Sequence, residues 1–325
     1  MNEKTPFIRL AKREDMPKHK IWLIRAAAFI LAILLGGVVF LVAGTDPFTA
    51  YGAILTSSLG KQTGIQQVIK IAVPLLGTAL ALAPCFAMRF WNIGGEGQIT
   101  MGAVAASFFA LNFAGSIPSP ILLLLMGIFS MVFGAAWAGI PAVFKAKWGT
   151  NETLFTLMLN YIAIGIVGWL QGGPWEGKPG SQIIPMFNQA AVLPKVFGVH
   201  CGWIIVLILT ALMYVYMNYT KQGYEISVLG ESENTARYAG MNVTRVTIRT
   251  VCLSGAICGL VGFMVCSGAN MTLYADVAGG VGFTAIVVAW LSQFNPFAMI
   301  AISLLLAVLD NGASGLQTTL RGPAS

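Results

Sequence analysis

The residues best suited to chemistry in this chain lie in one short stretch, RFWNIGGEGQITMG, at residues 89–102. It holds a carboxylate, Glu96, and two carboxamides, Asn92 and Gln98, among glycines that include Gly95 and Gly97. Such groups on a flexible backbone could bind a phosphate or another polar solute. The phosphate-binding interpretation is weak, because the spacing G-x-G-x-x-G is absent and no Lys-Ser/Thr pair follows.

Few other residues could hold a metal ion or carry out catalysis. The five cysteines form no CxxC pair and the chain has two histidines, which argues against a zinc or haem site. We expect the cysteines to act as small buried hydrophobic residues. The sequence therefore predicts no metal, no cofactor and no enzymatic activity in this chain.

The elements that position the stretch must lie in a membrane. Apolar residues make up 57% of the 325 residues, charged residues make up 10%, and the mean hydropathy is +0.77. Soluble domains average about 45–50% apolar and about 25% charged residues. We therefore predict an all-α, polytopic membrane helix bundle.

The chain has room for about nine to ten transmembrane helices of about 20 residues each. They form one domain at residues 21–325. The Asn295-Pro296 pair predicts a helix break, because the residue before proline is pushed out of the α region. The predicted spans are residues 21–43, 67–88, 99–115, 119–143, 152–171, 201–219, 249–271, 282–294 and 297–311.

The distribution of basic residues predicts the orientation. If residues 1–20 form a basic cytoplasmic tail, fourteen of the 19 Lys and Arg residues fall on the cytoplasmic side, as the positive-inside rule requires. This bias explains the sequence pI of about 9.2 without a nucleic-acid partner. The C-terminal segment QTTLRGPAS then lies outside, and we expect it to be a loop that leads toward one more span.

A short internal repeat suggests two broken helices. Residues 94–97, GGEG, recur as GGVG at 279–282, and each copy opens a short span followed by a proline-containing break. We place the first copy at the cytoplasmic end and the second at the outer end. Inverted repeats with broken helices near the midplane are typical of transporters, and non-helical backbone at that depth must be buried in protein or line a cavity.

Two interpretations of Glu96 remain open at this point. As an intramembrane carboxylate it would be a pivot or a pathway group. As part of a cytoplasmic turn it would lie in water beside the next helix. In the first case we expect Glu96 to accept hydrogen bonds from backbone N–H groups at the start of the third span. We also expect a Cβ at Gly95 or Gly97 to be costly if the φ of that glycine is positive.

Two stretches of the chain resemble a known family when they are taken together. They are FWNIGGEGQITMGA and, at residues 151–168, NETLFTLMLNYIAIGIVG. The family is that of the permease subunits of ATP-binding cassette (ABC) importers. The family serves branched-chain amino acids, ribose and nucleosides, and the closest resemblance is to its nucleoside-type branch. It covers most of residues 20–320. It implies a multi-pass protein of the bacterial cytoplasmic (inner) membrane.

The resemblance also implies the partners. They are a cytoplasmic ATP-binding cassette ATPase, a second permease subunit that is identical or different, and an extracytoplasmic substrate-binding lipoprotein. The chain has no Walker A motif of its own, so ATP hydrolysis must occur on a separate subunit.

A polar loop at residues 220–248 is the predicted ATPase contact. Its segment SENTARYAGM predicts a short helix that starts at Ser232 or Asn234 and stops at Gly240. The resemblance places the coupling loop here, where an ATPase would push. The residues assigned to this role are Gly230, Glu231, Asn234, Ala236, Arg237, Tyr238 and Gly240.

The polar groups inside the spans suit an uncharged cargo such as a nucleoside, with purine nucleosides favoured. Thr156 and Asn160 are spaced i, i+4 and share one helix face, and such residues either contact cargo or hydrogen-bond between helices. The residues assigned to the pathway or to a helix break are Asn92, Gly95, Glu96, Gly97, Gln98, Thr156, Asn160, Gln293 and Asn295.

Three other functions stay open. One is a permease of the same family for a sugar or a branched-chain amino acid. Another is a secondary transporter driven by an ion gradient, for which Glu96 and Asp310 are the carboxylates that could serve. A membrane enzyme is the third, and the sequence offers little catalytic material for it.

Overall fold

The computed structural model describes residues 17–320, and it is a bundle of helices with one small β-hairpin. The helices and strands are α1 (Lys18–Val42), α2 (Pro47–Leu59), α3 (Gln62–Ala87), α4 (Gly95–Phe113), α5 (Ser119–Trp148), α6 (Glu152–Gln171), β1 (Lys195–Val196), β2 (Val199–His200), α7 (Gly202–Tyr219), α8 (Lys221–Glu231), α9 (Glu233–Tyr238), α10 (Val243–Met264), α11 (Val281–Leu291) and α12 (Pro296–Leu320). A 3-10 turn, Gln189–Ala191, precedes the hairpin, and a π-helical turn, Val265–Asn270, extends α10.

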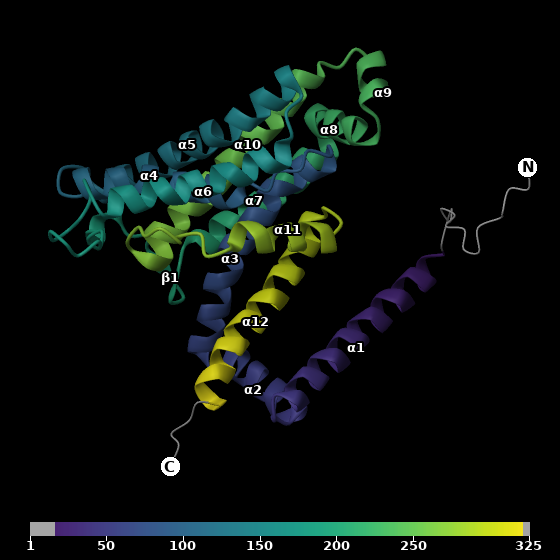
Figure 1. Cartoon of the computed structure of the whole chain (residues 1–325), viewed down its shortest axis with the longest axis vertical. Coiled ribbons are helices and arrows are strands. Elements are labelled where there is room, and N and C mark those ends of the chain that lie inside the picture. Colours follow the sequence, from purple (N-terminus) through teal and green to yellow (C-terminus); the bar gives the residue numbers. More distant parts are fainter. Residues whose placement is uncertain (1–16, 321–325) are drawn as a thin grey trace, which may run out of the picture.

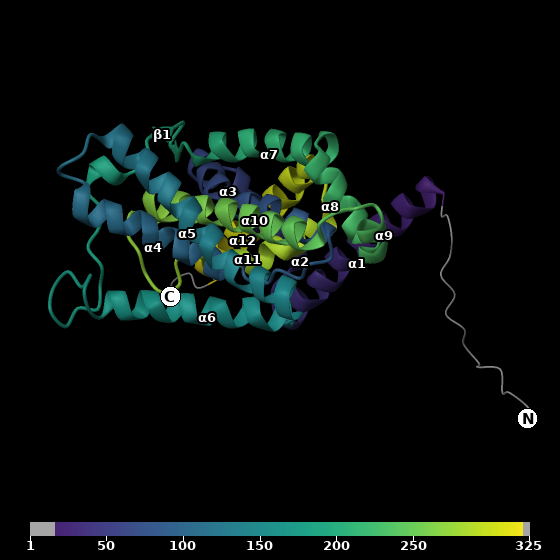
Figure 2. The same ribbon diagram turned by 90° about the horizontal axis from the view of Figure 1, so that it is seen from above.

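Five helices, α4, α5, α6, α7 and α10, run side by side and form the body of the molecule (Figures 1 and 2). At one end of this body lie α8 and α9, and at the other lies the β-hairpin. We call these the α8–α9 end and the hairpin end. In Figure 1, α1 stands apart from the body and meets it through α2, which packs on α12 and α3.

Small residues let the central helices pack closely. Gly102 of α4 lies against Gly259 of α10, and Gly134 of α5 lies against both Gly255 and Gly259. A Cβ at any of these glycines would overlap backbone atoms of the neighbouring helix. Close backbone approach at small residues is the usual mode of helix association in membranes, and here it packs α4, α5 and α10 directly on one another.

Six helices of the described chain are long and apolar enough to cross a membrane: α3, α5, α6, α7, α10 with its π-helical turn, and α12. The bent pair α1 and α2 adds a seventh if it counts as one span. The short apolar helix α11 has 11 residues and is about 16 Å long, roughly half of a hydrocarbon core of about 30 Å. The predicted class, an all-α polytopic membrane protein with broken helices, is confirmed.

Each of the nine predicted spans corresponds to a helix, but three features differ from the prediction. First, α2 and α8 are additional helices in segments predicted as loops. Second, α1 begins at Lys18, inside the predicted tail at residues 1–20, of which 1–16 lie outside the described residues. Third, α12 continues to Leu320, so the expectation of a loop from residue 317 was wrong as far as the described residues extend.

At the hairpin end, His200 is 2% exposed. Its ring lies close to Gly202 of α7 and Gly268 of the π-helical turn, and neither ring nitrogen has a hydrogen-bond partner. Burial, together with the nearby Lys70 ammonium, lowers the pKa of His200 to about 4. The imidazole is therefore neutral at pH 7.

Acidification should destabilise the hairpin end through His200. The unfolded histidine has the higher pKa, so the contribution of His200 to stability is complete above about pH 6.5 and is lost as the pH falls toward 4. We expect a loss of about 3 kcal/mol in the free energy of unfolding. The melting temperature in detergent should therefore fall less between pH 7 and pH 4.5 in His200→Leu than in wild type. Equal pH sensitivity of the two proteins would contradict this.

Candidate functional site: a helix junction and a terminal helix pair

The N-termini of α4 and α11 meet inside the bundle. Glu96, in the first turn of α4, is 3% exposed. Its two carboxylate oxygens accept hydrogen bonds from the backbone N–H groups of Gly280 (2.7 Å) and Gly282 (2.8 Å) at the start of α11. A carboxylate at a helix N-terminus pairs with the free N–H groups and with the positive end of the helix dipole. One side chain thus joins two helices that lie far apart in the sequence.

This junction of α4 and α11 lies near the middle of the bundle's thickness. Gly97 donates to the Asn160 side chain of α6 at 2.9 Å. Asn160 is eight residues from Glu152 and eleven from Gln171, the two ends of α6. At 1.5 Å per residue, the junction lies about 12 Å from one end of α6 and about 16 Å from the other.

Two buried carboxamides stabilise the turn that leads into α4. Asn92 is 0% exposed and Gln98 is 1% exposed. The Asn92 oxygen accepts from the backbone N–H of Gly94 and from the Gln98 side chain, both at 3.0 Å. The Asn92 amide also donates to Ser254 of α10 at 3.3 Å. These bonds satisfy polar groups that would be costly to bury unpaired.

The helix α6 fixes the same turn from the other side. Thr156 accepts from the Ile93 backbone N–H at 3.2 Å, and Asn160 donates to the Ile93 carbonyl at 2.9 Å. Both side chains are 1% exposed. The predicted i, i+4 pair therefore lies on one face and binds the backbone of residues 93–97, in the manner of a polar contact between helices.

The structure brings together seven of the nine residues predicted for the pathway or the break: Asn92, Gly95, Glu96, Gly97, Gln98, Thr156 and Asn160. The other two lie apart, in the turn between α11 and α12. There Gln293 is exposed, with a φ of 52°, and Asn295 accepts from the N–H groups of Phe297 and Ala298 at the start of α12.

Two expectations about this stretch need correction, and one of the two interpretations of Glu96 is excluded. The two glycine motifs do not lie at opposite ends of the membrane, because Glu96 of the first binds the second. Glu96 does not accept from its own helix, since its partners belong to α11. The burial of Glu96 also does not fit a solvated turn.

Neither Gly95 nor Gly97 is among the residues with positive φ, so backbone conformation does not require glycine at either position. At Gly97 the reason for glycine is close approach instead. A Cβ there would lie 2.9 Å from the Asn160 side-chain oxygen and 3.0 Å from the Asn160 Cα. At Gly95 the nearest atoms would be at 3.4–3.5 Å, an ordinary contact.

Alanine should therefore distinguish these two glycines. We expect Gly97→Ala to lose about 1–3 kcal/mol by overpacking against α6. Gly95→Ala should be neutral or slightly stabilising, because alanine is the better helix former. Melting temperatures of the two purified variants check this, and a Gly95→Ala protein less stable than Gly97→Ala would contradict it.

At the α8–α9 end, the helix α9 begins and ends as the sequence predicts. The Ser232 side chain is the N-cap and accepts from the Thr235 backbone N–H at 3.3 Å. Gly240 has a φ of +75°. The N–H of Gly240 bonds to Arg237 and the N–H of Met241 to Ala236, the bonds of a Schellman C-cap. Local side-chain chemistry therefore fixes both ends of α9.

One face of α9 is exposed to solvent. Ala236 is 1% exposed, whereas Tyr238 is 93% exposed. Glu231, beside the start of α9, and Asn234, within it, are also exposed. Arg237 pairs with Glu233 one turn earlier at 2.7 Å, and both side chains are more than half exposed. An exposed tyrosine beside an arginine has the composition of an interface hot spot.

The helix α8 connects α9 to the body through Gly230. A Cβ at Gly230 would overlap the carbonyl oxygen of Ala87, the last residue of α3. On the other side of α8, Glu225 pairs with Arg249 of α10 at 3.0 Å. The last turn of α8 is therefore packed closely on the end of α3, and residues 88–94 connect that end directly to the junction.

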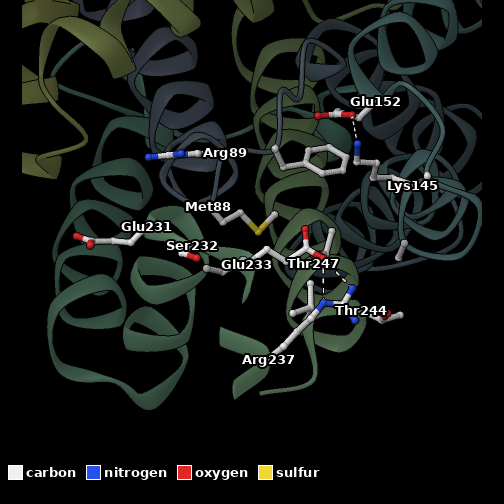
Figure 3. A pocket seen from close by; sticks show the side chains of 15 residues that line it. Met88, Arg89, Lys145, Glu152, Glu231, Ser232, Glu233, Arg237, Thr244 and Thr247 are labelled. Carbon is white, nitrogen blue, oxygen red and sulfur yellow. Dashed lines mark hydrogen bonds and ion pairs between the residues drawn. The ribbon is translucent and has the colours of Figure 1, made fainter. Parts of the chain in front are cut away.

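A cavity of about 540 Å³ separates α9 from the ends of α3, α5, α6 and α10 (Figure 3). Figure 3 shows Lys145 directed at Glu152 on one side of the cavity, where the two side chains form an ion pair of 2.8 Å, and Arg237 turned back onto Glu233. Its lining is mostly polar and includes Arg89, which has a φ of 62°. Among the described residues no cluster of His, Cys, Asp and Glu could hold a metal ion.

The decisive contacts of this region were not predicted from the sequence. They are the bonds from Glu96 to Gly280 and Gly282, and the contact of Gly230 with Ala87. The repeated glycine motif was the available signal for the first, because each copy opens a helix. No sequence signal pointed to the second.

Comparison with known proteins agrees with this architecture. Residues 64–321 match the family described as "Branched-chain amino acid transport system / permease component". The chain is 32% identical to the glucose ABC transporter permease protein TsgB13 of Haloferax volcanii, over 98% of this chain and 87% of that protein. It is 29% identical to the nucleoside ABC transporter permease protein NupB of Lactococcus lactis, over 90% and 84%. It is 30% identical to the guanosine ABC transporter permease protein NupP of Bacillus subtilis, over 90% and 85%.

Proposed function

The chain belongs to the permease-component family of branched-chain amino acid transport systems, and from this we propose that it forms the translocation path of an ABC importer for nucleosides. Two of the relatives named above carry the words nucleoside or guanosine in their names. The chain itself is a transport subunit, and hydrolysis of ATP belongs to a partner.

The choice of an uncharged cargo rests on the burial and the hydrogen bonds of Glu96. It is the one buried carboxylate among the described residues, and two backbone N–H groups already occupy its two oxygens. The other buried polar side chains of the described chain are hydroxyls, carboxamides and His200. A path without free charge suits a solute that has donors and acceptors but no net charge.

The proposed orientation places the α8–α9 end in the cytoplasm and the hairpin end outside. Lys145, Lys147, Lys221 and Arg237 lie at the α8–α9 end, as the positive-inside rule requires. The partners follow from this orientation. An ATPase docks on α9, an extracytoplasmic binding lipoprotein delivers cargo at the hairpin end, and a second permease completes the path.

The geometry supports a mechanical connection between ATP hydrolysis and the path. A push on α9 reaches α8, passes to the end of α3 where Gly230 contacts Ala87, and continues through residues 88–94 to Glu96. At the junction the same push moves α4 and α11 together, because Glu96 joins the two helices. Glu96, Asn92, Thr156 and Asn160 then act as positioning groups that keep the junction rigid.

The contact with the ATPase can be tested with Arg237→Glu combined with Tyr238→Ala. Both side chains project from α9 into solvent, so the variant should fold and insert normally. We expect ATPase co-purification and nucleoside uptake to fall together, by about tenfold or more. Gln222→Glu, at an exposed position of α8 outside the residues assigned to the contact, is the matched control. Unchanged co-purification and uptake would remove α9 from this role.

A sugar is the second candidate cargo. The glucose permease of Haloferax volcanii covers 98% of this chain at 32% identity, and a sugar is also uncharged.

A secondary transporter has less support. Glu96 is bound to α11, and Asp310 is exposed on α12, so the two carboxylates do not form a relay across the membrane.

The energy source tests the class of transporter. We expect nucleoside uptake by the assembled importer to stop with vanadate, which blocks ABC ATPases. It should continue when a protonophore removes the proton gradient at constant ATP. Loss of uptake with the protonophore alone would favour the secondary transporter instead.

A further inference from the structure

Two tryptophans stack on one another beside the junction. The rings of Trp91 and Trp290 have centroids 5.5 Å apart and are inclined by 19°. Phe86 lies behind both, at 5.9 Å from each, and is 3% exposed. Trp91 and Trp290 are 46% and 45% exposed. The pair is therefore held in place from behind and open on its outer surface.

The position of Trp91 argues against a surface that faces lipid tails. Trp91 lies in the non-helical segment between α3 and α4, two residues before the backbone that Thr156 and Asn160 bind. Irregular backbone at membrane depth is found where it is covered by protein or lines a watery cavity. Trp290 stacks directly on Trp91 and shares that environment.

The pair continues a face that begins at the junction. Phe283, Thr284, Val287 and Trp290 are exposed along α11, at the spacing of one helix face. Trp290 is nine residues beyond Val281, so it lies about 13.5 Å from the junction toward the α8–α9 end. Beyond it lies Phe294, whose ring centroid is 5.0 Å from that of Trp290. Together with Gln293 and Asn295, Phe294 lines a cavity of about 700 Å³.

We propose that Trp91 and Trp290 form a stacking surface for the base of the cargo as it leaves the junction toward the cytoplasm. The proposal rests on the nucleoside function proposed above and adds a site to it. Every nucleobase has a flat π face, so aromatic stacking holds any base without reading its identity. Stacking also lets the cargo leave again, as a conducting path requires.

The test compares three variants of the assembled importer, with radiolabelled guanosine and adenosine as probes. One is Trp91→Ala with Trp290→Ala, the second is the corresponding pair of phenylalanine substitutions, and the third is Trp169→Ala. Trp169 is 68% exposed on α6 near the hairpin end and makes a matched control. Uptake is divided by the amount of inserted permease. ATPase stimulation by the loaded binding protein is measured in parallel.

We expect the alanine pair to reduce uptake of both nucleosides about tenfold per inserted molecule, with ATPase stimulation retained. The phenylalanine pair should keep most of the uptake, and Trp169→Ala should match wild type. Equal uptake per inserted molecule in the alanine pair and in Trp169→Ala would overturn the proposal. That result is also the one expected if the two tryptophans only anchor the protein at the membrane surface.

If the alanine pair inserts too poorly to assay, the single variant Trp91→Ala is scored by the same rule. The wild-type measurement separates the two proposals. Wild-type uptake of nucleosides with an unaffected alanine pair overturns the stacking surface alone. Wild-type uptake of glucose without nucleosides overturns the nucleoside function and the stacking surface together.

Discussion

Glu96→Leu should prevent stable assembly of the junction and abolish transport. The leucine leaves the N–H groups of Gly280 and Gly282 without acceptors in a buried site, at about 1–3 kcal/mol for each unpaired donor. It also removes the negative charge at the start of α11, where the helix dipole favours it. Folding yield, melting temperature and uptake should all fall.

Glu96→Gln is the matched control, because it keeps the size and one acceptor of the side chain. We expect an intermediate defect, so that damage follows the order leucine, glutamine, wild type. A Glu96→Leu protein that folds and transports normally would contradict the junction. If Glu96→Gln folds normally but does not transport, the charge itself acts in the transport cycle and Glu96 is more than a positioning group.

Gly230→Ala should uncouple the two ends of the molecule. The added Cβ would overlap the Ala87 carbonyl oxygen, and backbone cannot move aside cheaply, so α8 must shift away from α3. Because α9 is capped by its own residues, the ATPase should still bind. We expect ATP hydrolysis in the assembled complex to continue, while nucleoside uptake falls by about tenfold or more.

Gln222→Ala is the control for this change, because Gln222 lies on the same helix, is exposed and is not among the residues assigned to coupling. It should transport like wild type. Uptake by Gly230→Ala at the level of Gln222→Ala would show that the contact of α8 with α3 does not transmit the movement.

Features that depend on neighbouring residues could be predicted from the sequence. The start and end of α9 follow from Ser232 and Gly240, whose side-chain and backbone preferences act within a few residues. The shared face of Thr156 and Asn160 follows from helical spacing alone. The helical membrane class follows from composition together with apolar runs of about 20 residues, the length of a helical span.

Features that depend on tertiary contacts could not be predicted from the sequence. The partner of Glu96 is 184 and 186 residues away, and a carboxylate at a helix start says nothing about which helix it binds. Gly97 and Gly230 are glycine because other elements approach them closely, and sequence does not distinguish close approach from a positive φ. The helix α8 was missed because its polar residues resemble a loop. Its stability comes from the Arg249 ion pair and the contact with α3.

The most direct test of the account is the cargo of the wild-type importer. The permease is assembled with its ATPase, second permease and binding protein, and uptake of radiolabelled guanosine, adenosine and glucose is measured with ATP and with vanadate. We predict vanadate-sensitive uptake of the nucleosides, undiminished by excess unlabelled glucose. Vanadate-sensitive uptake of glucose with no uptake of either nucleoside would contradict the account.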